Sequence, residues 1–212
     1  MNKISKVMAG VLSCACIVGV MVGCNQSKKT IEGTAGEIIE KINVAAYGEN
    51  YMESEDMLLP LITFTKESLE EEYRSMYEGE ADMLTEQLIS EYVTGRLDTK
   101  IISYGILENM DGVIEVACSE PMMMGMPYFV VVVRFDEKTD VQAKTKYMYD
   151  NADRNAWVCT QADESFAACY GDVAVFAMMS GTFKEESSKL SVENYSKAFA
   201  TVCGEEVDYI AK

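Results

Sequence analysis

Between residues 34 and 47, apolar side chains recur at the spacing of one helix face. Ile38 and Ile42 belong to this face. Thr34 is followed three residues later by Glu37, the spacing of a capping box at a helix N-terminus. The pattern therefore predicts a helix over residues 34–47.

Four later stretches are also predicted to be helical. One begins at Ser191, a residue type that favours the N-cap position. Another is expected to stop near Gly95, because glycine is disfavoured in helix interiors. The four stretches cover residues 66–77, 80–93, 140–151 and 191–202.

The middle of the chain changes to patterns typical of β-strands. Residues 129–133 are apolar at every position, which indicates a central strand buried on both faces. Gly171-Asp172 separates two apolar runs, as in a two-residue β-hairpin. Residues 48–62 contain Pro60 and are predicted to be extended or turning. The predicted strands cover residues 101–107, 113–118, 128–135, 166–170 and 173–179.

The order of these elements predicts an α+β fold, because helices come first, strands follow and helices return. We expect a largely antiparallel sheet of about four to five strands, packed with N-terminal, middle and C-terminal helices. No internal repeat is present, and only residues 24–33 have the composition of a linker. The sequence therefore predicts one domain over residues 34–212.

Residues 1–23 have the composition of a secretory signal peptide. Lys3 and Lys6 make the start positive, and residues 7–23 are uncharged and mostly apolar. The alternative is an uncleaved membrane anchor, for which this run is short and rich in glycine. Under both interpretations residues 25–212 lie outside the cytoplasm.

The end of this leader carries a second signal, Met21-Val22-Gly23-Cys24. This quartet resembles the lipobox of bacterial lipoproteins, although Met21 stands where Leu is most common. The resemblance implies cleavage before Cys24 and a diacylglycerol on the Cys24 sulfur. Two acyl chains hold a protein stably at a membrane, whereas one chain binds only marginally.

The order of elements from Ala35 to Phe199 also resembles a family of small bacterial lipoproteins that carry an extracytoplasmic domain of unknown function. An early helix, an acidic segment, a central strand, a helix and a late hairpin occur in that order. Tyr170-Gly171-Asp172, followed by an apolar strand, is the most suggestive stretch. The resemblance supports the fold class and the location, and implies no activity.

Charge and composition narrow the function classes. The chain has 35 acids, 18 bases and no histidine, with a net charge of −17 that becomes −19 without the leader's two lysines. Such a surface repels nucleic acid and favours cationic peptides, cationic solutes or divalent metals, although solubility explains it equally well. Without histidine or a catalytic motif, we expect no enzymatic activity and no cofactor.

The string between Pro121 and Pro127 is rich in methionine. Thioethers are soft ligands that select Cu(I), and three of these residues alternate along the chain. Methionine is also common at adaptable binding surfaces and as a filler of cores, and a strand connection explains the string most simply. Met122, Met124 and Met126 are thus weak metal candidates, and the candidate partner contacts are Met122, Met123, Met124, Met126 and Tyr128.

Four cysteines remain beyond Cys24 in the exported part, at positions 118, 159, 169 and 203. No two are spaced as C-x-x-C, which disfavours a zinc or thioredoxin-like site. Two of them, Cys118 and Cys169, lie in strand-like runs, where a free thiol is a small buried hydrophobe. We expect buried thiols, with one disulfide as the alternative in an exported chain.

Other candidate sites have simpler explanations. Asn151, Asp153 and Asn155 have the spacing of a calcium loop, but the required Gly and Glu are missing, which favours a turn after a helix. Trp157 is expected to cap an edge of the core. Runs of acids usually form a solvated face, and they occur at 53–56, 70–72 and 78–82.

Taken together, the residues predict a membrane-anchored extracytoplasmic lipoprotein that binds a small ligand or an envelope protein without catalysing a reaction. The alternative is a structural protein of the envelope that docks a basic partner through its acidic surface. An enzyme is the least favoured class.

Overall fold

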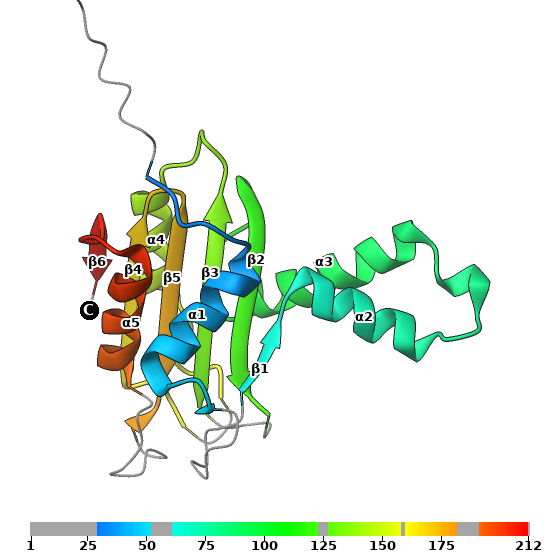
Figure 1. Ribbon diagram of the computed structural model, residues 1–212, viewed down its shortest axis with the longest axis horizontal. Helices are drawn as coiled ribbons and strands as arrows, with labels where there is room; N and C mark the ends of the chain where they lie inside the picture. Colours follow the sequence, from blue (N-terminus) through cyan, green and yellow to red (C-terminus); the bar gives the residue numbers. More distant parts are fainter. Residues whose placement is uncertain (1–28, 52–60, 123–126, 158–159, 182–190, 212) are drawn as a thin grey trace, which may run out of the picture.

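A six-stranded antiparallel sheet with the strand order β1-β2-β3-β5-β4-β6 organises the fold (Figure 1). The computed structural model describes residues 29–51, 61–122, 127–157, 160–181 and 191–211. The strands are β1 Leu61–Phe64, β2 Val113–Pro121, β3 Tyr128–Phe135, β4 Glu164–Tyr170, β5 Val173–Met179 and β6 Tyr209–Ala211.

The centre of the sheet is formed by β3 and β5, which pair over seven residues from Tyr128↔Met179 to Arg134↔Val173. Every residue of β5, and every residue of β3 except Arg134, is buried. This confirms the predicted central strand, and helices cover both of its faces.

One face of the sheet is covered by α1 (Ala35–Tyr47) and α5 (Val192–Cys203), which lie side by side in Figure 1. Ile38, Ile42 and Phe199 point into this layer and are completely buried. Both helices begin as predicted: Thr34 and Glu37 form the capping box of α1, and the Ser191 side chain caps α5.

The opposite face is covered by α4 (Val141–Asn151), and a hairpin of α2 (Lys66–Met76) and α3 (Glu86–Ser103) joins the same apolar cluster at one edge. A 3-10 turn, Ala81–Met83, joins the two hairpin helices. The hairpin projects from the β1–β2 edge of the sheet (Figure 1). The domain is therefore a sheet with α1 and α5 on one face, α4 on the other face and the α2–α3 hairpin at one edge.

The predicted end of the third helix near Gly95 is wrong, because α3 continues through Gly95 to Ser103. Its buried positions are four residues apart and continue past the glycine: Ile89, Val93, Leu97 and Ile101. This apolar face contributes more than the low helix propensity of one glycine costs. The predicted strand over residues 101–107 is consequently also wrong.

The α+β class and the antiparallel sheet are confirmed, but six strands exceed the four to five expected. The additional strands are the short edge strands β1 and β6. β1 lies at the end of the segment 48–62 that was predicted to be extended or turning. The hairpin at Gly171-Asp172 joins β4 and β5 as predicted.

We predict that Gly95→Ala stabilises the protein by about 1 kcal/mol, because alanine has the higher helix propensity. An added Cβ at Gly95 meets no atom within 4 Å. Thermal unfolding should show a rise of about 2–4 °C. As a control, Gly171→Ala should lower the midpoint, since Gly171 has φ +60° and its Cβ would lie 1.9 Å from the Lys29 carbonyl oxygen. A lower midpoint for Gly95→Ala would contradict this account of α3.

Candidate functional site

The two halves of β2 have different neighbours. Its second half pairs with β1, from Phe64↔Cys118 to Leu61↔Pro121. After Phe64 the chain leaves the sheet at Thr65, which caps the N-terminus of α2. Within the described ranges, Val113–Ala117 therefore pairs with β3 alone, and we call this stretch the open edge.

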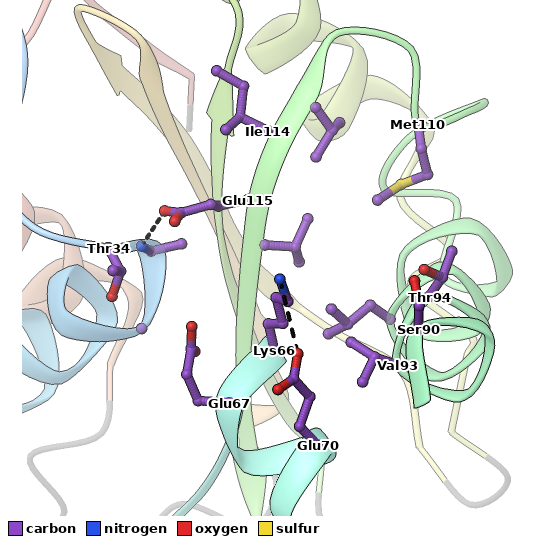
Figure 2. Close-up of a pocket in the computed structure, with 15 residues that line it drawn as sticks. Thr34, Lys66, Glu67, Glu70, Ser90, Val93, Thr94, Met110, Ile114 and Glu115 are labelled. Carbon is purple, nitrogen blue, oxygen red and sulfur yellow. Dashed lines mark hydrogen bonds and ion pairs between the residues drawn. The ribbon is translucent and has the colours of Figure 1, made fainter. Parts of the chain in front are cut away.

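A cavity of about 340 Å³ lies against the open edge, and we call it the β2 cleft (Figure 2). Four elements line it: the first turn of α1, the start of α2, one side of α3 and β2 itself. These elements are distant in the sequence, and only the folded sheet brings them together.

The cleft has an apolar floor. Val93 and Leu97 come from α3, and Val113 and Val116 come from β2. Ile114 also lines the cleft and is 59% exposed, next to a register irregularity between β2 and β3. A large exposed aliphatic side chain beside an apolar floor favours contact with a partly apolar ligand.

The rim of the cleft is acidic. Glu67 and Glu70 come from α2, and Glu115 comes from β2 (Figure 2). Lys66 is the only basic residue in the lining, and its Nζ lies 3.8 Å from Glu70 Oε1. Glu70 lies beside Lys66, and Glu115 lies 3.8 Å from Arg134. Glu67 therefore leaves the rim with an excess negative charge that favours a ligand with a positive charge.

Glu115 also joins two elements of the fold. Its carboxylate accepts a hydrogen bond of 2.9 Å from the backbone N–H of Ala35, in the first turn of α1. A carboxylate at a helix N-terminus satisfies a free donor and complements the helix dipole. The α1 wall of the cleft is thereby attached to β2.

The first turns of α1 and α2 approach each other closely beside the cleft. A Cβ at Gly36 would lie 2.7 Å from Thr65 Cγ2, so a larger residue at Gly36 requires the Thr65 side chain or one of the helices to move. Thr65 and Ser68 form a second capping box, at the N-terminus of α2. This contact gives the cleft a defined wall.

Arg134 connects the segment before α1 to the sheet. Its guanidinium contacts Asp172 at 2.6 Å and donates to the carbonyl oxygens of Ile31 and Gly33 at 2.8 and 2.7 Å. Its Nε lies 3.8 Å from a Glu115 oxygen. The end of the predicted linker 24–33 therefore belongs to the folded domain. A single charge in the otherwise apolar run of β3 was the available sequence signal, and the sequence reasoning missed it.

A second contact holds the beginning of this segment. Lys29 forms an ion pair of 2.8 Å with Asp208, whose other oxygen accepts a hydrogen bond from the Gly171 backbone. Burial opposes ionisation of Asp208, but these two hydrogen bonds outweigh it and lower its pKa. Residues 29–33 thus lie against the β4–β5 turn.

Tyr128 was predicted as a partner contact, and the structure contradicts this. Its side chain is 1% exposed, and its hydroxyl lies 3.3 Å from that of Tyr47 in α1. Tyr195 of α5 packs on the same ring, so α1 and α5 cover the Tyr128 side chain and no partner can reach it. Met122 is 56% exposed at the end of β2. Met123, Met124 and Met126 lie outside the described residues.

The described cysteines are free thiols, as expected, and two of the three are buried. Cys118 and Cys169 are buried, Cys203 is partly exposed, and all three are free. Burial raises the pKa of the Cys118 thiol to about 12. Cys159 lies outside the described residues. A protonated, buried thiol is a poor nucleophile, so Cys118 is assigned to packing.

The remaining candidates have structural roles. Asp153 accepts a hydrogen bond from the Asn155 backbone in the turn after α4, as predicted. Trp157 packs at the edge of the core. Glu72, in the acidic run 70–72, accepts from Tyr92 and lies 3.7 Å from Arg96. The described residues contain no group of three or more Cys, Asp or Glu side chains arranged to hold a metal ion.

We predict that Arg134→Met destabilises the protein by about 3 kcal/mol, because it leaves the Asp172 carboxylate partly buried without its cation. The two side chains are 13% and 17% exposed. The unfolding midpoint should fall by about 6–12 °C. Lys197→Met is the matched control, since its pair with Glu193 is exposed and should change the midpoint by less than about 2 °C. Equal effects would show that Arg134 has no special role.

Comparisons with known proteins identify no relative of this chain, so its candidate site is identified from geometry alone. The chain matches no protein-family model, no curated protein and no solved structure. Among the described helices, none combines the length and the apolar character needed to cross a bilayer. The β2 cleft, with its apolar floor, acidic rim and open strand edge, is the candidate functional site.

Proposed function

We propose that this protein is a lipid-anchored, extracytoplasmic binding domain that holds a cationic, partly apolar ligand in the β2 cleft. The single observation that carries the binding role is the cleft itself, about 340 Å³ in volume beside an open strand edge. This volume is in the range of ligand pockets, roughly 300–1,000 Å³.

The leader supports the location. The lipobox-like quartet ends at Cys24, and Lys29, only five residues later, already contacts the folded domain through Asp208. Cys24 would carry a diacylglycerol and hold the domain at the outer face of the cell membrane. The acidic surface would keep the domain away from anionic headgroups.

The cleft is built for binding rather than for proton transfer. Its Glu115 carboxylate is held by the Ala35 N–H and lies near Arg134, and Lys66 is paired with Glu70. Ser90 and Thr94 are the hydroxyl residues that α3 contributes to the cleft lining, and the chain has no histidine to activate them. We therefore assign no catalytic residue.

A second candidate function is docking of a basic protein by the α2–α3 hairpin. The hairpin projects from the sheet and is acidic, with exposed side chains at Glu71, Glu78 and Glu80 (Figure 1). This alternative needs no cleft, so a variant that fills the cleft distinguishes the two functions.

We predict that Cys24→Ala abolishes incorporation of labelled fatty acid and moves the protein from the membrane to the soluble fraction, because it removes the acylated sulfur. Cys16→Ala is the control and should leave both properties unchanged. Labelling of the Cys24→Ala protein would overturn the anchoring proposal.

We predict that a small alkyl-amine raises the unfolding temperature of the detergent-solubilised protein. At about a hundred times its dissociation constant, a ligand adds roughly 2.7 kcal/mol of stability. Ser90→Trp, at an exposed position of α3 on the cleft wall, should fill the cleft and abolish this shift. A shift that survives in Ser90→Trp would place binding elsewhere, and an absent shift in the parent would count against the alkyl-amine class.

A further inference from the structure

The open edge carries an inference that rests on the proposed function and makes its ligand more specific. Folded proteins usually cover or blunt the edge strands of their sheets, because free N–H and C=O groups pair with other strands. Here β1 covers β2 only from Cys118 to Pro121. Of the uncovered stretch, Val113–Val116 lines the β2 cleft, whereas most surface edges face bulk water.

The backbone of the open edge is available on one side. In an antiparallel ladder, alternate residues direct both N–H and C=O toward the same neighbour. β3 takes one set of these groups along Val113–Ala117. The other set points along the line that β1 would follow if it continued. In this set the Val113 N–H already donates to the Met110 carbonyl oxygen at 3.1 Å, so the available groups lie mainly at Ile114 and Val116.

The geometry leaves a path for one added strand. β1 ends at Phe64, and α2 starts at Lys66 beside the lower end of the cleft (Figure 2). Above that point, α1 stands on one side of β2 and α3 on the other (Figure 2). A strand lies about 4.8 Å from its neighbour, so an extended segment of about five residues would continue the line of β1.

The two walls of this path differ in chemistry. Glu115 and Ala117 project to the α1 face of the sheet, where Glu115 contacts Ala35. Val116 projects to the opposite face, in the same apolar cluster as Val93 and Leu97 of α3. Because side chains alternate along a strand, an added strand would present one row to the carboxylate and the other row to the aliphatic groups.

The negative charge of the cleft favours a positively charged partner. Glu67, Glu70 and Glu115 line the cleft together with Lys66, and the whole chain has a net charge of −17. A second copy of this acidic chain would be repelled, whereas a basic segment would be attracted. The alternating walls favour basic residues in one row and aliphatic residues in the other.

We propose that the open edge of β2, Val113–Ala117, binds an extended segment of another protein by β-strand addition, and that basic and aliphatic residues alternate along this segment. Main-chain hydrogen bonds would provide affinity, and the two walls would provide specificity.

The test uses the full chain in detergent and a fluorescent acetyl-(Lys-Val)4-amide peptide. Two matched probes carry N-methyl groups on alternate residues, one on the lysines and one on the valines, so that each loses the N–H donors of one edge. We expect the parent peptide to bind, and at least one methylated probe to bind about tenfold more weakly. Hydrogen exchange at Val113–Ala117 should slow when the parent peptide is added.

Two charge-reversal variants provide the protein control. Glu67→Lys lies in the cleft lining and should weaken peptide binding at least about fivefold. Glu71→Lys makes the same charge change at an exposed position of the same helix, outside the lining, and should change binding less than about twofold. Equal effects of the two variants would overturn binding in the cleft.

Other outcomes separate this inference from the proposed function. If both methylated probes bind as tightly as the parent and Ser90→Trp abolishes binding, strand addition is wrong and cleft binding stands. If the alkyl-amine binds and the peptide does not, only the peptide inference fails. If neither binds, both proposals fail. If light scattering shows a dimer that Ser90→Trp converts to a monomer, the occupant is a second copy and the proposed partner is wrong.

Discussion

The position of α1 against the sheet depends on the contacts of the Arg134 guanidinium. This side chain stands in the central strand, is 13% exposed, and contacts Asp172, Glu115 and the backbone before α1. A charge removed from water is tolerated only where several partners satisfy it. These partners come from the N-terminal segment, β2 and the β4–β5 turn. The Arg134 side chain thus holds the start of α1 against the sheet. Glu115 holds it there as well, because its carboxylate accepts a hydrogen bond from the Ala35 N–H.

The cleft follows from this alignment and from the shortness of β1. The chain leaves the sheet after Phe64, because Thr65 caps α2 and its side chain lies against Gly36. The first turns of the two helices therefore meet beside β2, and one edge of its first half has no neighbouring strand among the described residues. Since α3 stands on the other side, the uncovered edge lies in a cavity with one acidic and one apolar wall. The proposed function depends on this combination of backbone and side-chain chemistry.

The sequence correctly predicted elements that are fixed by neighbouring residues, such as caps and turns, and strands that are buried along their whole length. The capping box at Thr34, the apolar run of β3 and the hairpin at Gly171-Asp172 all appear as expected. Errors arose where tertiary packing outweighed a local rule. Gly95 remains helical because Leu97 and Ile101 are buried beyond it. Tyr128 was predicted to contact a partner together with the methionine string, yet α1 and α5 bury it.

The sequence by itself determined the α+β class, the positions of most helices and strands, and the expectation of an exported, lipid-anchored chain. These properties are encoded in neighbouring residues, through periodicity, caps and the leader. Only the tertiary structure decided the partners of Arg134, the contact between Glu115 and Ala35, and the open edge of β2. Glu115 and Ala35 are 80 positions apart, and no local pattern relates them. The candidate site therefore became visible only when the sheet had brought distant segments into contact.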